Sequence, residues 1–140
     1  MQWYARASQL ADIAAFQERH RLTCVLDHLA GLGPRPGTDT ASWAALRRVA
    51  EGGGWIKLSG WYRLDATAPY VELDDTIHRA ASVFRERCVW GSDWPHTMFL
   101  EPGRDTPGPA YPQTLHPVQR ALGDALAEEV LRSYPGQLYR

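Results

Sequence analysis

“CVWGSDWPHT”, residues 88–97, is an apolar run of strand type that ends in a carboxylate and an imidazole. Its first three residues form a continuous apolar segment, which is typical of a parallel strand covered on both faces. A Gly-Ser pair then interrupts the run, and Asp93 and His96 follow. In parallel α/β folds, ligands bind and catalytic groups gather beyond the carboxyl ends of the strands. We therefore predict that Asp93 lies at the mouth of a pocket.

Two further stretches pass from an apolar strand to a reactive side chain in the same way. “VLDH” ends in His28, and “KLSGWYR” ends in Arg63. Amphipathic patterns between these stretches indicate helices, the first of which we expect Ser8 to cap. The predicted strands cover residues 2–5, 23–27, 55–59 and 87–92. The later helices are predicted over residues 42–51, 72–84 and 118–131, and we expect Gly123 and Asp124 to divide the last of them.

This alternation predicts the fold class. Strands that alternate with helices of about ten or more residues indicate βα units and a parallel sheet. Four such units form either a small doubly wound sheet or half of an eight-stranded barrel, and the reactive strand ends favour the barrel. The predicted class is α/β, a partial (β/α)8 TIM barrel whose helices lie outside a parallel sheet, as one domain over residues 1–140.

Composition excludes several classes of partner. The 140 residues carry a formal charge of -1 and are 44% hydrophobic, so we expect a globular domain that binds neither nucleic acid nor an anionic membrane. No apolar run approaches the roughly 20 residues that span a bilayer, and residues 1–10 lack the pattern of a secretory signal. Cys24 and Cys88 lie in apolar runs, which favours buried free thiols over a disulfide. Free thiols are typical of a reducing compartment, so we expect a cytoplasmic location.

His28 and Asp93 are the candidate catalytic residues. An ionised carboxylate at position 93 can accept a proton from water as a general base, or bind a metal ion. The imidazole of His28 can ligate a metal or polarise a carbonyl group. Each has a structural alternative of comparable weight: a turn aspartate satisfied by backbone N–H groups, and a hydrogen-bonded histidine at a strand end.

Three more residues are candidate substrate contacts. Arg63 carries a guanidinium that can clamp a substrate carboxylate with two parallel donors, unless it is simply solvated. Tyr4 can donate a hydrogen bond to the same ligand or serve in packing. His96 can reach a substrate or a neighbouring carboxylate, or have no role.

Taken in order, four blocks resemble one known family. “VLDHLAG”, “WIKLSGWYRL”, “RCVWGSDWPHT” and “EEVLRSYPGQLYR” are similar to the C-terminal half of the amidohydrolase-related (amidohydrolase 2) enzymes, predicted metal-dependent TIM-barrel hydrolases that include the 2-pyrone-4,6-dicarboxylate lactonases. The resemblance extends over nearly the whole chain. It implies a (β/α)8 barrel of which this chain supplies about the last four βα units.

The resemblance also implies roles for individual residues. Asp93 matches the family's general base, and His28 matches a histidine that contacts metal or the substrate carbonyl. Arg63 falls at a substrate-carboxylate arginine of the lactonase branch, Tyr4 near a position lining the same pocket, and His96 at the histidine of “DWPH”. A divalent ion, zinc or manganese, is implied for part of the family, with His28 and Asp93 as its ligands here, and the lactonase branch is expected to need none.

The departures from the family bear on activity. The family's first strand carries a His-x-His pair, and this sequence contains none. We expect an incomplete barrel that is inactive alone, or that needs an N-terminal half or self-association to close. The leading hypothesis is a hydrolase in which water attacks a lactone or a similar cyclic ester or amide. The alternatives are a metal-dependent decarboxylase of a related branch and a non-catalytic half-barrel that assembles with a partner.

Overall fold

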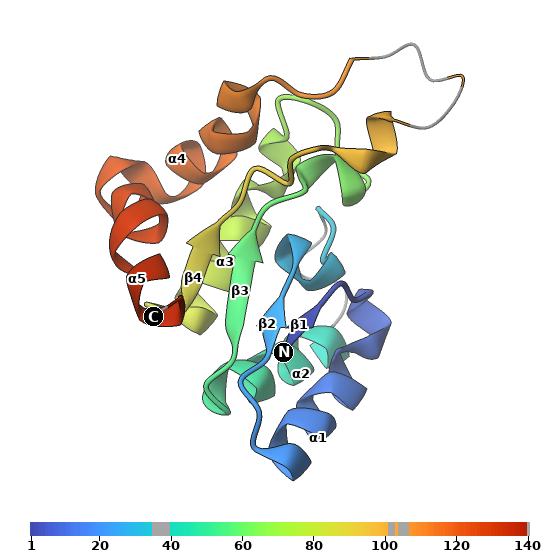
Figure 1. Ribbon diagram of the computed structural model, residues 1–140, viewed down its shortest axis with the longest axis vertical. Coiled ribbons are helices and arrows are strands. Elements are labelled where there is room, and N and C mark those ends of the chain that lie inside the picture. The colour runs from blue at the N-terminus through green and yellow to red at the C-terminus, as the bar shows by residue number, and fades with distance from the viewer. Residues whose placement is uncertain (35–39, 101–102, 104–106, 140) are drawn as a thin grey trace.

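A four-stranded parallel sheet lies at the centre of the computed structural model, which describes residues 1–34, 40–100, 103 and 107–139. Its strands lie side by side in the order of the sequence: β1 (Gln2–Trp3), β2 (Val25–Leu26), β3 (Trp55–Leu58) and β4 (Cys88–Trp90). In register, Val25 is opposite Trp55, and Ile56 is opposite Cys88. Because all strands run in one direction, their carboxyl ends share one edge of the sheet, the upper one in Figure 1.

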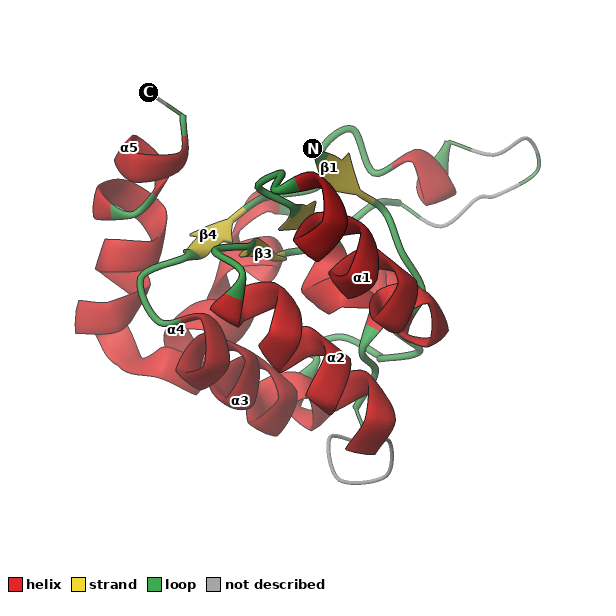
Figure 2. Cartoon of the chain, turned by 90° about the horizontal axis from the view of Figure 1, so that it is seen from below, coloured by secondary structure: helices red, strands yellow, loops and turns green. Residues whose placement is uncertain are grey.

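Helices follow the strands as the βα pattern predicts. Helices α1 (Leu10–His20), α2 (Thr40–Glu51) and α3 (Asp74–Phe84) form a layer along one face of the sheet (Figure 2). Helix α4 (Tyr111–Glu128) comes after β4 and continues through a π-helical turn (Glu129–Ser133) into α5 (Pro135–Leu138). Short 3₁₀ turns complete the described elements: Ala7–Gln9, His28–Gly31, Trp61–Arg63, Val71–Leu73 and Thr97–Phe99.

The core has two parts because successive residues of a strand point to opposite faces. Leu26, Ile56 and Leu58 belong to the large cluster that the strands share with α1, α2 and α3. The alternate positions Val25, Trp55 and Val89 form a second cluster, against which Tyr134 and Leu138 pack. Both faces of β2, β3 and β4 therefore carry buried apolar side chains, which accounts for the apolar runs in the sequence.

The predicted elements are present, but several bounds differ. Ser8 does not cap the first helix, because it lies inside the turn Ala7–Gln9 and α1 begins at Leu10. The Gln9 side chain accepts a hydrogen bond from the Arg6 backbone N–H and supports this turn instead. The strands are shorter than predicted, since backbone pairing ends where the chain turns at the sheet edge.

The last helix starts earlier than predicted, at Tyr111 rather than residue 118. The Pro- and Gly-rich sequence over residues 101–117 indicates a connecting segment, but Pro112 occupies the first turn of the helix, where its missing N–H costs nothing. Gly123 has φ 75° and ψ 163° and divides α4, as the sequence indicated. The Gly- and Pro-rich run over residues 31–40 likewise indicates a loop, and both this loop and the segment over residues 101–117 lie partly outside the described residues.

Other expectations concern single residue types. Cys24 and Cys88 are both buried free thiols, and burial raises the pKa of Cys88 to about 12. Trp43 and Trp61 are almost fully buried in the core. None of the helices in the described part of the chain combines the length and apolar character that crossing a bilayer requires.

Candidate functional site

His28 stands on an unusual backbone turn at the end of β2. His28, Leu29 and Ala30 all have left-handed backbone, with φ of 49°, 50° and 57°, and Gly31 continues it at 70°. This conformation is energetically unfavourable for residues other than glycine, and it persists only where the surrounding structure holds it in place. Leu29 and Ala30 are fully buried, so packing holds the turn and with it the position of the imidazole.

The His28 ring is buried and neutral at pH 7. Its Nδ1 lies 3.0 Å from Ser59 Oγ, at the end of β3, and its ring meets the Tyr4 ring edge-on at 5.1 Å. Burial lowers the pKa of His28, and the carboxylates of Asp93 and Asp27 oppose this shift without reversing it. The ring therefore keeps one nitrogen for Ser59 and presents the other, Nε2, to the sheet edge.

Gly60 allows this arrangement. It has φ 63°, and a Cβ at that position would lie 2.3 Å from His28 Nδ1. Any larger residue at position 60 would displace the imidazole, so the glycine in “KLSGWYR” makes room for the histidine of the neighbouring strand.

Asp93 is held by side chains from the turn after β3. Its Oδ2 accepts a 2.5 Å hydrogen bond from the Tyr62 hydroxyl and a 2.6 Å hydrogen bond from Arg63 Nε. Burial and the Asp93 carboxylate both raise the pKa of Tyr62, so the phenol stays protonated and acts as the donor. These two hydrogen-bond donors to the carboxylate lie about thirty residues away in the sequence. The alternative of a turn aspartate bonded to nearby backbone N–H groups therefore does not describe these contacts.

Arg63 lies between two aromatic rings. Its guanidinium carbon is 5.6 Å from the centroid of Tyr4 and 5.1 Å from that of Tyr62. Its Nη2 donates to Thr97 Oγ1 at 3.0 Å, in addition to the ion pair with Asp93. Burial works to lower the pKa of Arg63, but the hydrogen bond and charge of Asp93 outweigh it, so the pKa is raised. The predicted alternative of a solvated arginine does not hold, since the side chain is only 10% exposed.

The two oxygens of Asp93 have different surroundings. Oδ2 has two strong donors, whereas Oδ1 faces His28 Nε2 at 3.6 Å. That separation is too long for a hydrogen bond. It is short enough for one small oxygen atom, of a water or a carbonyl group, to contact both side chains. The arrangement pairs a carboxylate with a neutral imidazole around a single reaction point.

The structure therefore brings four of the five predicted residues into direct contact and links the fifth through an intermediary. His28, Arg63, Asp93 and Tyr4 adjoin one another at the sheet edge. His96 reaches them through Tyr62, whose hydroxyl is 3.5 Å from His96 Nδ1.

Sequence reasoning missed Tyr62 and Ser59. Both lie inside the quoted stretch “KLSGWYR”, where only its last residue was singled out. A signal existed for Ser59, since it follows the strand directly, but Tyr62 is placed by the left-handed turn at Gly60, which the sequence pattern does not reveal.

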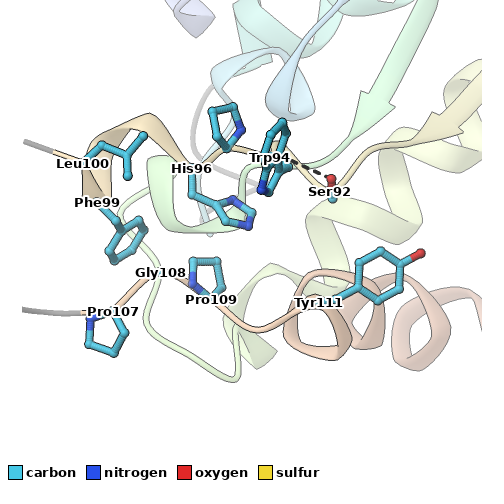
Figure 3. A pocket seen from close by; sticks show the side chains of 10 residues that line it. Ser92, Trp94, His96, Phe99, Leu100, Pro107, Gly108, Pro109 and Tyr111 are labelled. Carbon is cyan, nitrogen blue, oxygen red and sulfur yellow. Dashed lines mark hydrogen bonds between the residues drawn. The ribbon is translucent and has the colours of Figure 1, made fainter.

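A cavity of about 840 Å³ adjoins this centre. Figure 3 shows its two walls: side chains of the loop after β4, including Trp94, His96 and Phe99, and the segment that leads into α4, including Pro109 and Tyr111. Asp93 lies between two lining residues, Ser92 and Trp94, in the sequence.

His28 and Asp93 do not by themselves make a metal site. Across the described residues, no group of three or more His, Cys, Asp or Glu side chains could hold a metal ion, whereas catalytic zinc usually has three protein ligands. The guanidinium of Arg63 also already balances the charge of Asp93. The expected ligation of zinc or manganese by His28 and Asp93 stays a prediction.

Comparison with known proteins gives a family and a set of relatives. The amidohydrolase family model matches residues 2–140. The chain is 30% identical over 118 residues to a 4-sulfomuconolactone hydrolase of Rhizobium radiobacter, a match that covers 82% of this chain and 38% of the relative. It is 27% identical over 129 residues to a D-galactarolactone isomerase of Agrobacterium fabrum, covering 88% of this chain and 42% of that protein.

Solved structures agree on the fold. A probable 2-pyrone-4,6-dicarboxylic acid hydrolase of Acinetobacter baumannii, crystallised with citric acid, superposes with a TM-score of 0.75 at 23% identity. The superposition covers 99% of this chain and 51% of the other. The chain therefore spans about two fifths of the length of these relatives by sequence and about half of the solved structure.

The hydrogen bond from Tyr62 to Asp93 leads to a stability prediction. Tyr62→Phe removes the phenol that donates to the carboxylate, and hydrogen bonds to charged groups contribute about 1.5–3 kcal/mol. We expect the free energy of unfolding to fall by about 1.5 kcal/mol in urea titrations. Tyr139→Phe, at a largely exposed position, serves as the control and should change it by less than about 0.5 kcal/mol. Equal effects of the two variants would contradict the role of this hydrogen bond.

The lowered pKa of His28 predicts a pH dependence. The unfolded chain takes up a proton at position 28 near the ordinary pKa of about 6.5, whereas the folded chain does so only at lower pH. Stability that is present above pH 6.5 is therefore lost as the pH falls toward the lowered value of the folded state.

His28→Gln cannot take up this proton. We expect a smaller loss in the free energy of unfolding between pH 7 and pH 5 than in the wild type, measured by urea denaturation at each pH. His78→Gln, on an exposed face of α3, should keep the wild-type loss. A wild-type loss in His28→Gln would show that the ring is not held neutral by burial.

Proposed function

The chain belongs to the amidohydrolase family, and on this premise we propose that it takes part in the hydrolysis of a lactone or similar cyclic ester. The contact that supports the proposal most is the approach of Asp93 Oδ1 to His28 Nε2 at 3.6 Å, with Oδ2 held by other donors. A general base must lie within about 3 Å of the water oxygen that it deprotonates, and among the described contacts of Asp93, Oδ1 is the oxygen left for that water. The names of two relatives, a lactone hydrolase and a lactone isomerase, point to the same substrate class.

The proposed reaction uses the side chains of Asp93 and His28. Water held at Asp93 Oδ1 gives its proton to the carboxylate while its oxygen attacks the ester carbonyl. His28 Nε2–H donates a hydrogen bond to the carbonyl oxygen as negative charge develops there. The ring C–O bond then breaks, and the protonated Asp93 returns the proton to the departing alkoxide. The products are a carboxylic acid and an alcohol within one opened molecule.

The neutral state of His28 suits this role. A neutral imidazole carries one N–H, and when the Ser59 hydroxyl donates to Nδ1 that proton resides on Nε2. The lowered pKa of the ring keeps it a hydrogen-bond donor without a full positive charge, which would otherwise form an ion pair with Asp93.

The remaining predicted residues complete the proposal. Arg63 first orients Asp93, and it meets an acidic group of the substrate with donors that Asp93 does not use. Tyr4 is 68% exposed and contacts both His28 and Arg63, which supports a role for it in ligand binding. His96 contributes a hydrogen bond on the side of the cavity.

A second candidate is isomerisation of a lactone, as the name of the Agrobacterium fabrum relative indicates. The same acid–base pair can move an ester link between two hydroxyl groups of one molecule. Hydrolysis creates a carboxylic acid that releases a proton near pH 7, whereas isomerisation does not, so titration at constant pH separates the two.

We also propose that further strands complete the sheet into a (β/α)8 barrel, of which this chain forms the C-terminal half. Within the described sheet, β1 and β4 each have one edge without a paired strand. Such edges are a liability that barrels remove by closure. The added strands come from an N-terminal half or from a second copy of the chain.

Asp93→Asn tests the base. An amide cannot accept the proton, so we expect lactone hydrolysis by the assembled protein to fall by at least about 100-fold, the usual contribution of a general base. Proton release at constant pH measures the rate. Asp124→Asn makes the same chemical change at an exposed position of α4 and should retain wild-type activity. Retained activity in Asp93→Asn, or equal losses in both variants, would remove Asp93 as the base.

The barrel proposal has its own test. We expect lactone hydrolysis only from fractions in which the chain is assembled, as measured by light scattering during size-exclusion chromatography with activity followed across the peak. A monomer that hydrolyses lactones at enzyme-like rates would show that four strands are sufficient.

A further inference from the structure

The guanidinium of Arg63 divides its hydrogen bonds between two side chains of the loop after β4. Nε donates to Asp93 Oδ2 at 2.6 Å, and Nη2 donates to Thr97 Oγ1 at 3.0 Å. Among the described contacts, none is a hydrogen bond from Arg63 to the other carboxylate oxygen, Oδ1. Nε and Nη2 lie on one edge of the planar group and form the fork that commonly binds both oxygens of a carboxylate. At Arg63 this fork is split.

Two other arginines of the chain show the undivided fork. Arg48 donates from Nε and Nη2 to the two oxygens of Glu18, at 3.0 and 2.8 Å. Arg120 places Nε and Nη2 on the carboxylate of Asp74, at distances from 2.7 to 3.1 Å. The side chains of both pairs are partly exposed, so burial does not impose this arrangement. Binding both oxygens is thus what an arginine fork does here when no other acceptor takes one of its donors.

The split leaves one oxygen of Asp93 open. Tyr62 donates to Oδ2 as well, so both strong donors lie on the same oxygen. Oδ1 faces His28 Nε2 at 3.6 Å. A fork that bound both oxygens would bring Nη2 against Oδ1, where the proposed reaction places the water. The carboxylate oxygen would then accept a hydrogen bond from a cation, and the water would have to displace that donor before it could react.

We propose that Thr97 is a positioning residue for the base: its hydroxyl holds Nη2 of Arg63 away from Asp93 and so keeps Oδ1 available to water. The inference rests on the proposed hydrolysis and adds a residue that acts on it through Arg63. Thr97 begins the 3₁₀ turn Thr97–Phe99, four residues after Asp93, so both acceptors of the fork belong to one loop. The guanidinium cannot turn toward Oδ1 without losing its bond to Thr97.

Crystal structures of the wild type and of Thr97→Val test this geometry without any reaction. Valine has nearly the shape of threonine but no acceptor, and the position is exposed, so the variant should fold. We expect Nη2 of Arg63 to move to about 3 Å from Asp93 Oδ1 in Thr97→Val, whereas Thr97→Ser should keep the split fork. A guanidinium that stays in place in Thr97→Val would overturn the inference.

Hydrolysis of δ-valerolactone by the assembled protein tests the consequence. This lactone has no acidic group, so Arg63 does not bind it as an anion. In Thr97→Val we expect kcat to fall at least about tenfold, because water must displace a charge-assisted hydrogen bond, while KM changes less than about twofold. Thr97→Ser should restore at least about half of the wild-type kcat. A change confined to KM, or equal losses in Thr97→Val and Thr97→Ser, would contradict the positioning role.

Thr67→Val is the matched control for these measurements. It makes the same change at another exposed threonine, whose hydroxyl has no hydrogen bond among the described contacts, and it should match the wild type in kcat and KM. A loss in Thr67→Val as large as that in Thr97→Val would also count against the inference.

The outcomes separate this inference from the proposed function. If the fork closes on Asp93 in Thr97→Val but Asp93→Asn retains wild-type hydrolysis, the placement of Arg63 by Thr97 stands and Asp93 is not the base. If Asp93→Asn loses hydrolysis but Thr97→Val neither moves the guanidinium nor slows turnover, Asp93 remains the base and the inference about Thr97 is wrong.

Discussion

The carboxylate of Asp93, bonded to Tyr62 and Arg63, is the interaction on which the site depends. It joins the ends of β3 and β4, and the hydrogen bond between His28 and Ser59 joins β2 to β3 in the same manner. Both contacts require strands that run in parallel, in sequence order and in the observed register, since otherwise the three strand ends would not meet. Two separate apolar clusters on the two faces of the strands support that register, because a slip of one residue would exchange their side chains between the faces.

Charge at this edge is balanced locally. Asp93, after β4, forms an ion pair with Arg63, after β3. Asp27, after β2, forms an ion pair with Lys57 of β3 at 3.2 Å. Burial is the main cause of the lowered pKa of His28; the carboxylates of Asp93 and Asp27 act to raise this pKa, and the charges of Arg63 and Lys57 act to lower it. The neutral imidazole is therefore a product of the whole arrangement rather than of any one contact.

The sequence was sufficient for the parts of this site that follow from periodicity. Apolar runs that end in His28, Arg63 and Asp93 indicated three strands with a common edge, and that edge is where these side chains meet. It was insufficient where the backbone departs from ordinary conformations. The left-handed turn through Leu29 and Ala30, with φ of 50° and 57°, occurs at residues that seldom adopt it, so no turn signal marked it. Tyr62 was missed for the same reason, since the turn at Gly60 determines where it points.

The two oxygens of Asp93 also restrict how a substrate can approach. Oδ2 already accepts hydrogen bonds from Tyr62 and Arg63, so in the proposed reaction water meets the carboxylate on the side of Oδ1, where His28 stands. Tyr62 contacts both Asp93 and Phe99, and Phe99 lines the neighbouring cavity. The residue that holds the base in place is thus also packed against a wall of that cavity.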